Sequence, residues 1–186
     1  SVGHSNATFE QTIETVAAGA TCFTHLYNAM SGIQARDPGV IAAAFDSQSY
    51  YGLIADGIHV HPAMVRMAYR QNPNMTLVTD AMPPVGTDET EFQWHGKTIH
   101  RKEDRLVDAE GRLAGAYLTQ QQALINAMMM LRLGIEDALP MVTTKPAKLL
   151  GLEETHGQVE PGFVADLMLI NETGEVSRAW RAGYEL

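Results

Sequence analysis

The chain has 186 residues, of which 45% are hydrophobic and 19% are charged, a balance typical of a folded protein with one main core. Its formal net charge of −9, without any block of lysine and arginine, argues against nucleic acid and anionic membrane surfaces as partners. The single cysteine excludes an internal disulfide and favours a cytoplasmic setting, and no apolar run reaches the ~20 residues of a membrane span.

The first half of the chain alternates between short apolar runs and helical patterns. A short run ending at His4 is typical of the last residues of a strand already under way. The expected helices cover residues 9–18, 40–45 and 62–71, and the expected strands cover residues 21–25, 50–56 and 75–80. Such alternation with short connections predicts right-handed βαβ units and a parallel sheet.

The pattern changes after residue 90. Two hairpin signals within residues 91–114 predict an antiparallel insertion. A helix is expected over residues 118–133, ended by Gly134, and further helical turns over 135–142 and 146–150, interrupted by Pro140. The tail alternates again and predicts two or three antiparallel strands. We therefore expect two parts, residues 1–152 with the insertion, and residues 153–186.

Residues with metal-binding or acid–base chemistry stand where the expected strands end. His4, His25 and Asp80 close three of them, and His59 lies in the exit of a fourth. Neighbouring parallel strands lie about 4.8 Å apart, so such side chains can meet at one ion. A catalytic zinc usually takes three protein ligands, and a nearby carboxylate can act as base and then proton donor. The pattern favours a metal-dependent hydrolase, although Asp80 alone is equally typical of a turn cap.

Six motifs carry a more specific signal, in this order: GHSNAT (3–8), THLYNAM (24–30), ARDPG (35–39), ADGIHV (55–60), LVTDA (77–81) and LAGA (113–116). With them the chain resembles the C-terminal half of the N-acetylglucosamine-6-phosphate deacetylases, of the amidohydrolase superfamily. The resemblance implies an α/β fold, the second half of a (β/α)8 TIM-like barrel (strands 5–8) with a C-terminal piece of a small β-sandwich domain. It also implies hydrolysis of the acetamide of N-acetylglucosamine 6-phosphate to glucosamine 6-phosphate and acetate.

The resemblance also assigns residues. It implies that His4 and His25 bind a divalent metal, usually Zn²⁺, as one or two ions, and that Asp80 activates the attacking water and protonates the leaving amine. The third metal ligand, a glutamate, is expected to lie outside this chain. The implied substrate contacts are Asn28, Ala29, Arg36, His59, Leu113 and Gly115. In the family the arginine reaches the neighbouring subunit's site, so a homodimer is expected.

The chain departs from the family at three positions: Ala116 replaces a usual serine, and Ala35 and Asp37 replace a glycine and a glutamate. Two other interpretations stay open. One is another amidohydrolase, acting on a cyclic amide or an amine, and the other is a non-catalytic fragment that binds only metal or a partner chain. We further expect that the N-terminal half of the barrel is missing here and that these residues alone are inactive. No functional role is expected for His61, His95, His100 and His156.

Overall fold

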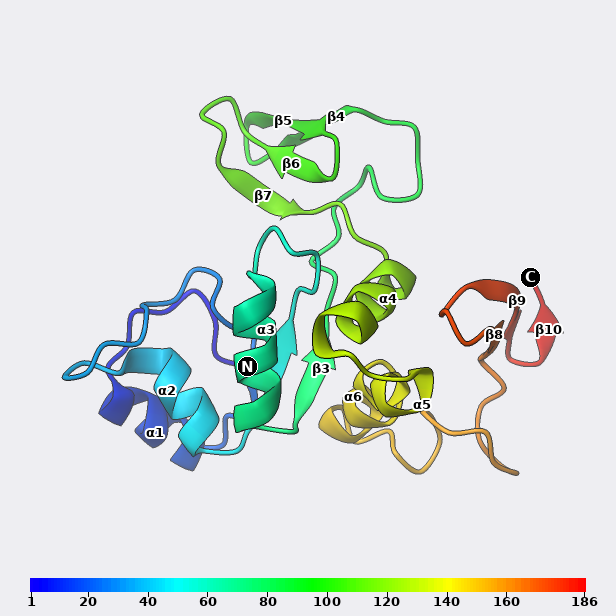
Figure 1. Cartoon of the computed structure of the whole chain (residues 1–186), viewed down its shortest axis with the longest axis horizontal. Helices are drawn as coiled ribbons and strands as arrows, with labels where there is room; N and C mark the ends of the chain where they lie inside the picture. Colours follow the sequence, from blue (N-terminus) through cyan, green and yellow to red (C-terminus); the bar gives the residue numbers. More distant parts are fainter.

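A computed structural model describes residues 1–186, and a parallel sheet lies at its centre (Figure 1). The sheet has the order β1-β2-β3, with β1 (Cys22–Phe23) and β3 (Met75–Leu77) on either side of β2 (Tyr50–Leu53). Val2 forms a further parallel bridge to Phe23, beyond the edge of β1. The mixed α/β architecture and the parallel pairing agree with the prediction, but the strands are shorter than the apolar runs that predicted them.

The helices follow the sequence closely in the first half of the chain. The helices before residue 80 are α1 (Phe9–Ala17), α2 (Gly39–Asp46) and α3 (Pro62–Gln71). A capping box starts α1, in which the Thr8 hydroxyl accepts the backbone N–H of Gln11 and the Gln11 side chain accepts the N–H of Thr8. Proline at the first position starts α3, where its missing N–H is harmless.

The helices after the insertion are α4 (Gln120–Leu131), α5 (Ile135–Ala138), a 3₁₀ turn (Leu139–Met141) and α6 (Thr144–Leu149). The prediction that Gly134 ends the long helix is wrong. Arg132 ends it in the left-handed conformation (φ 58°), its N–H donating to the Met128 carbonyl, and Gly134 instead caps the start of α5. The predicted interruption at Pro140 is confirmed, since Pro140 lies in the 3₁₀ turn.

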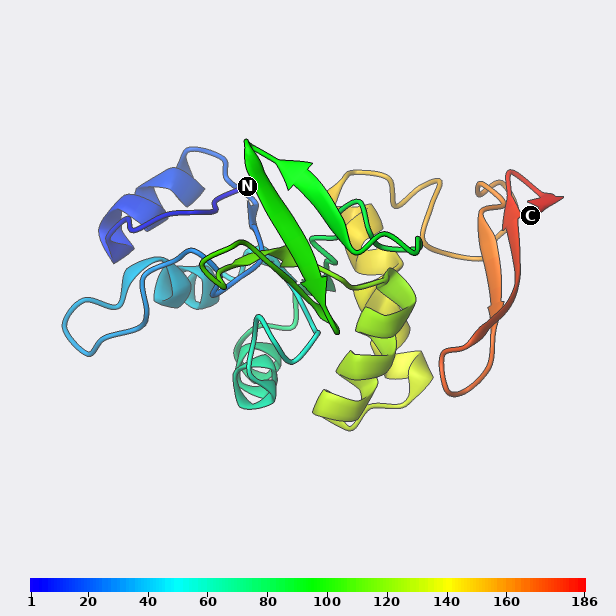
Figure 2. The same ribbon diagram turned by 90° about the horizontal axis from the view of Figure 1, so that it is seen from above.

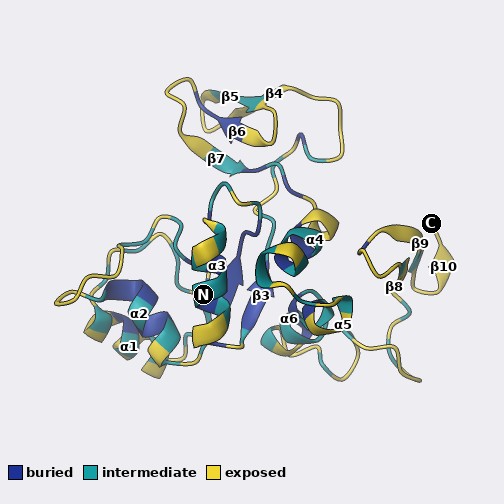
Figure 3. Ribbon diagram, viewed as in Figure 1, coloured by how far each residue is buried: buried dark blue, intermediate teal, exposed yellow.

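The main core lies between the parallel sheet and the helices around it, where the strands are the most buried elements (Figure 3). Phe23, Tyr51, Leu53 and Met75 are completely enclosed. The Tyr51 hydroxyl donates to the Asn72 carbonyl at 2.9 Å, so its polar end is satisfied inside the core. Truncating a residue of this kind to alanine costs about 2–5 kcal/mol, and this core holds the strand ends in register.

The insertion forms a four-stranded antiparallel sheet over the carboxyl ends of the parallel strands (Figure 1). Its strands are β4 (Glu91–Trp94), β5 (Lys97–Lys102), β6 (Arg105–Val107) and β7 (Leu113–Ala116). Both predicted hairpins are confirmed. A parallel bridge between Ala81 and Ala116 ties β7 to the segment that leaves β3.

The tail forms a small antiparallel sheet at one end of the molecule (Figures 1 and 2). Its β8–β9 turn contacts α4, where the Gln121 side chain donates to the Gly174 carbonyl at 3.2 Å. It consists of β8 (Leu167–Ile170), β9 (Val176–Arg181) and β10 (Tyr184–Glu185), which confirms antiparallel strands in the tail. Met168 and Tyr184 are largely exposed on it. None of the helices in the chain combines the length and the apolar character needed to cross a membrane.

Candidate active site

The three residues predicted at strand ends share an unusual backbone conformation. His4, His25 and Asp80 have φ values of 48°, 31° and 50°, in the left-handed region that residues other than glycine rarely enter. Such conformations cost about 1–3 kcal/mol each and persist where the surrounding structure enforces them, often at functional sites. This clustering marks the carboxyl edge of the parallel sheet as a candidate site.

Hydrogen bonds beside these residues fix their strained backbone. Directly after His25, the N–H of Leu26 donates to the Gly52 carbonyl at 2.8 Å. The carbonyl of Asp80 accepts the N–H of Ala116 at 2.8 Å, from the end of the insertion. The left-handed residues therefore end the regular pairing, which is why the strands stop before His25 and Asp80.

The two predicted metal ligands come together. The Nε2 atoms of His4 and His25 lie 3.0 Å apart, with the ring planes inclined by 54°. His25 is buried, whereas His4 is exposed at the rim. The elements that position them are adjacent in space, because Val2 bridges Phe23 two residues before each histidine.

This pair fits a divalent cation in part. A separation of 3.0 Å is less than twice the Zn–N distance of about 2.0–2.1 Å, so one ion can reach both nitrogens. The Nδ1 atom of His25 is buried without a hydrogen-bond partner, whereas a ligating histidine usually donates its second N–H. No three His, Cys, Asp or Glu side chains of the chain are grouped as a complete metal site. The chain thus supplies two converging imidazoles and one unpaired ring nitrogen.

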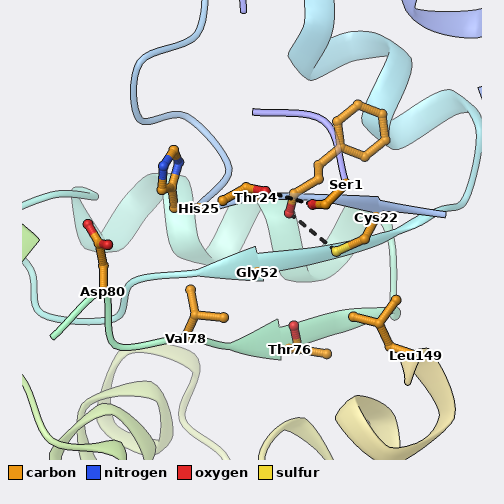
Figure 4. A pocket seen from close by; sticks show the side chains of 10 residues that line it. Ser1, Cys22, Thr24, His25, Gly52, Thr76, Val78, Asp80 and Leu149 are labelled. Carbon is orange, nitrogen blue, oxygen red and sulfur yellow. Dashed lines mark hydrogen bonds between the residues drawn. The ribbon is translucent and has the colours of Figure 1, made fainter. Parts of the chain in front are cut away.

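His25 and Asp80 line the same open cavity of about 210 Å³ on one face of the sheet. Figure 4 shows their side chains projecting from the same end of the strands. The rest of the wall comes from the sheet and its surroundings, with Ser1, Cys22, Phe23, Thr24, Gly52, Thr76, Val78 and Leu149. A Cβ at Gly52 would stand 2.9 Å from Val78, so glycine keeps this wall closely packed. The carboxylate of Asp80 is exposed at the mouth, where a water or a substrate can reach it.

His59 lies in the connection between β2 and α3 and is paired with Asp56, for which the sequence alone predicts no role. Its Nδ1 atom is 2.5 Å from Oδ2 of Asp56, and both side chains are more than nine-tenths buried. The other carboxylate oxygen accepts the backbone N–H groups of Ile58 and His59, at 2.9 and 2.8 Å. The signal was present in the sequence as Asp-Gly-Ile-His, an aspartate that can bond its own turn.

Asn28, Ala29 and Arg36 lie together in the loop between β1 and α2. Ala29 is left-handed (φ 51°), and the Asn28 amide donates to the carbonyls of His25 and Leu26 at 3.3 and 3.4 Å. The asparagine side chain therefore stabilises its own turn, next to the metal-ligand candidate. Arg36 is exposed near the tip of the loop.

Tyr27 connects this loop to the next one. Its hydroxyl donates to the carbonyl of Met64 in α3 at 3.2 Å, and burial raises the pKa of Tyr27 to about 12. The phenol therefore stays neutral and keeps its donor at physiological pH. The loop that carries Asn28 and the helix that follows His59 are held side by side in this way.

Leu113 and Gly115 lie in β7, beside the Asp80 segment. Gly115 has a positive φ of 69°, and a Cβ there would stand 2.4 Å from Cγ of Met82 and 3.0 Å from the Asp80 carbonyl oxygen. Glycine is thus required for the close approach of β7 to Asp80. Leu113 is 42% exposed, so its side chain is available for contact.

The four histidines for which no role was expected stay outside this cavity. His61 is the N-cap of α3, where its Nδ1 atom accepts the N–H of Ala63 at 3.1 Å. The other three lie in the insertion or the tail: His95, His100 and His156.

The amidohydrolase family matches the sequence over residues 1–184. The chain is 40% identical over 186 residues to the N-acetylgalactosamine-6-phosphate deacetylase of Shewanella sp. (strain ANA-3), covering 98% of this chain and 47% of that protein. It is 37% identical over 180 residues to the N-acetylglucosamine-6-phosphate deacetylase of Haemophilus influenzae, covering 95% of this chain and 47% of the relative. The chain spans about half the length of the curated relatives it matches.

A solved structure is similar over nearly the whole chain. The N-acetylglucosamine-6-phosphate deacetylase from Pasteurella multocida superposes with a TM-score of 0.95 at 33% identity. The match covers 99% of this chain and 49% of that chain. The fold of this chain is therefore one that is also found by experiment.

Proposed function

The chain belongs to the amidohydrolase family, and we propose that it carries the acid–base and metal-binding half of a deacetylase site for N-acetylhexosamine 6-phosphates. One observation carries the proposal: the Nε2 atoms of His4 and His25 face each other at 3.0 Å, at the sheet edge that also presents Asp80. The deacetylase names of the similar proteins supply the substrate class.

We also propose that the chain forms the second half of a (β/α)8 barrel with a small appended sheet. Val2, β1, β2 and β3 are four parallel segments in sequence order, as expected for strands 5–8 of a (β/α)8 barrel whose carboxyl ends carry the chemistry. Residues 1–152 then form the barrel part, and residues 153–186 form a piece of a small β-sandwich. The exposed sheet of the tail is compatible with this division.

His4 and His25 would hold a zinc-class divalent cation, with a glutamate outside this chain as the third ligand. Such an ion polarises an amide carbonyl and eases deprotonation of water. The Asp80 carboxylate accepts a proton from the attacking water and delivers it to the amide nitrogen as the C–N bond breaks. The products are acetate and the free amine of the sugar phosphate.

The loops around the cavity recognise the rest of the substrate in this proposal. Arg36 supplies a guanidinium, whose fork of N–H donors suits a phosphate, and reaches the site of a second copy in a homodimer. His59 supplies a ring nitrogen, and the adjacent loop contributes Asn28 and the backbone N–H group of Ala29. The backbone N–H of Asn28 itself donates to the His25 carbonyl at 3.0 Å. Leu113 and Gly115 contact the sugar or its acetyl group. A cytoplasmic setting fits this role in sugar-phosphate metabolism.

A second candidate concerns the sugar. The 40% identical relative is named for N-acetylgalactosamine 6-phosphate, which differs only in the configuration of one ring hydroxyl. Both sugars carry the same acetamide and phosphate, so the residues proposed here act identically on both. The two substrates must therefore be compared directly.

The test is to measure acetate release by the full-length protein. The substrates are N-acetylglucosamine 6-phosphate, N-acetylgalactosamine 6-phosphate and the two unphosphorylated sugars. We expect rapid hydrolysis of one or both phosphorylated sugars, and kcat/KM lower by at least about 100-fold without the phosphate. Equal rates with and without phosphate would favour another amidohydrolase reaction, and no hydrolysis of any of them would favour a non-catalytic chain.

A further inference from the structure

The buried pair of Asp56 and His59 has a defined direction of hydrogen bonding. Oδ1 of Asp56 is occupied by the backbone N–H groups of Ile58 and His59, and Oδ2 faces Nδ1 of His59 at 2.5 Å. An ionised carboxylate only accepts hydrogen bonds. The Nδ1 atom of His59 is therefore the donor and carries a proton.

The state of the carboxylate agrees with this direction. Burial alone raises the pKa of Asp56, but the hydrogen bonds from the His59 ring and from the backbone of His59 and Ile58 outweigh it, so the pKa lies below its ordinary value. Asp56 is ionised at neutral pH. A buried negative charge thus lies directly behind the imidazole.

The second ring nitrogen of His59 is left for a ligand. Nε2 makes no hydrogen bond within the chain. The side-chain atoms that are both fully enclosed and unpaired are His25 Nδ1 and Glu153 Oε2, so Nε2 of His59 reaches the surface. A ring that is otherwise more than nine-tenths buried thus exposes one polar atom.

The loop that carries the pair is anchored from behind. The Asn126 amide of α4 donates to the carbonyl of Ala55 at 2.8 Å and accepts a hydrogen bond from Gln122 at 2.8 Å. Ala55 is completely buried, directly before Asp56. The backbone of the pair is therefore fixed to the core rather than free to follow the ligand.

We propose that Asp56 is a positioning residue for substrate recognition, which accepts the hydrogen bond from Nδ1 of His59 and so directs Nε2 of the same ring toward the 6-phosphate. This inference rests on the proposed function and adds a residue to it. When a phosphate binds, the imidazolium lies between two anions and donates one hydrogen bond to each. A charged donor forms a hydrogen bond roughly twice as strong as a neutral one.

The substitution Asp56→Asn separates two roles of this side chain, which are to accept the hydrogen bond from His59 and to stabilise its own turn. The asparagine Oδ1 can still accept the two backbone N–H groups, but its amide group donates and so cannot accept from Nδ1. The imidazole should then change to the tautomer with the proton on Nε2 alone. The same logic of a carboxylate that fixes a tautomer is known from serine proteases.

The kinetic test uses the full-length protein with Asp56→Asn, His59→Gln and both together. Each single change should raise KM for the phosphorylated sugar about tenfold, with kcat within about twofold and no change for the unphosphorylated sugar. The double variant should lose no more than either single variant, because Asp56 acts through His59. Additive losses, or equal losses on both sugars, would overturn the proposal.

Asp108→Asn is the control, since Asp108 is also a buried turn carboxylate that accepts two backbone N–H groups, from Glu110 and Arg112. Its side-chain partners are Lys97 and Arg112 instead of a histidine. Its KM should equal that of the wild type. If Asp108→Asn raised KM as Asp56→Asn does, the effect would be one of turn stability and not of His59.

Nitrogen NMR of the His59 ring tests the proposal without any activity. In the wild-type protein Nδ1 should be protonated, and addition of the sugar 6-phosphate should shift the Nε2 resonance. In Asp56→Asn the proton should be on Nε2 alone. An unprotonated Nδ1 in the wild type overturns the inference even if the variants do not fold. An inactive wild type with the expected spectra would instead refute the proposed reaction.

Discussion

The Nε2 atoms of His4 and His25 lie 3.0 Å apart, although 21 positions separate the two residues in the chain. The parallel bridge between Val2 and Phe23 sets this register, since each partner stands two residues before its histidine. In a direct hydrogen bond between the two rings, the N–H of one ring would donate to the lone pair of the other. A cation between them uses both lone pairs, which is the geometry that the metal-binding proposal requires.

We therefore expect His25→Asn to release the metal. Losing even an outer partner of a ligand costs about 10–100-fold in metal affinity, and losing one of the ligands should cost more. The metal content of the full-length protein, measured by mass spectrometry after dialysis, should fall below one-tenth of the wild-type value. His100→Asn, a change at a half-buried histidine of the insertion beside Glu91, should keep the metal. Full occupancy in His25→Asn would remove His25 from the metal site.

Asp80→Asn should abolish proton transfer and leave the metal in place. The side chain keeps its size and its exposed position at the cavity mouth but no longer accepts a proton from water. We expect kcat to fall by about 100-fold or more, the scale of general acid–base catalysis. Asp88→Asn, in the exposed segment before β4, is the control and should retain wild-type kcat. Turnover near normal in Asp80→Asn would contradict its assignment as the acid and base.

The sequence predicted the helices better than the strands, because helix ends depend on neighbouring residues and strand ends depend on distant ones. Helix α3 matches its predicted range of 62–71 because Pro62 and His61 define its start by local chemistry. The strands end early because His25 and Asp80 turn into the left-handed conformation, which depends on contacts from distant segments. The same limit applies to the end of α4 at Arg132, where an ordinary residue takes the place of the expected glycine.

From the sequence, site residues can be predicted individually only where the residue type itself suggests a role. Histidines at strand ends indicate a metal, whereas the family resemblance assigns His59 to the substrate. Asp56 was not selected, because an aspartate before a glycine is typical of any turn, and its burial against His59 requires the folded loop. The close approach of Gly115 to Asp80 was likewise invisible, since the two are joined only by pairing of β7 with the segment after β3.

Arg36→Ala should weaken binding of the phosphorylated sugar selectively. Loss of a charge-assisted hydrogen bond costs about 1.5–3 kcal/mol, so KM should rise by roughly 10–100-fold, with little change for the unphosphorylated sugar. Arg70→Ala, at the exposed end of α3, controls for loss of one positive charge. Steady-state kinetics on both sugars decide the matter: similar losses on the two would assign Arg36 a structural role.

Gly115→Ala should damage the protein in two separable ways. The first is backbone strain, because alanine at a positive φ costs about 1–2 kcal/mol. Gly96→Ala is the matched control for this strain, since Gly96 has a φ of 75° against 69° for Gly115 and no atom within 4 Å of its Cβ position. In the control, the free energy of unfolding should fall only by this amount. Each kcal/mol corresponds to a fall in Tm of about 2–4 °C for a chain of this size.

The second effect is steric and reaches the active site. The new methyl group would stand 2.4 Å from Cγ of Met82 and 3.0 Å from the carbonyl oxygen of Asp80. The methionine can move, but the carbonyl belongs to the backbone that holds Asp80 in place through its hydrogen bond with Ala116. Gly115→Ala should therefore lose a further 1–3 kcal/mol or so, as overpacking does, and kcat should fall as well, whereas Gly96→Ala keeps its kcat. Thermal melts and turnover measured on the same two variants test this. Equal stability and equal turnover in both would show that β7 does not hold Asp80 in position.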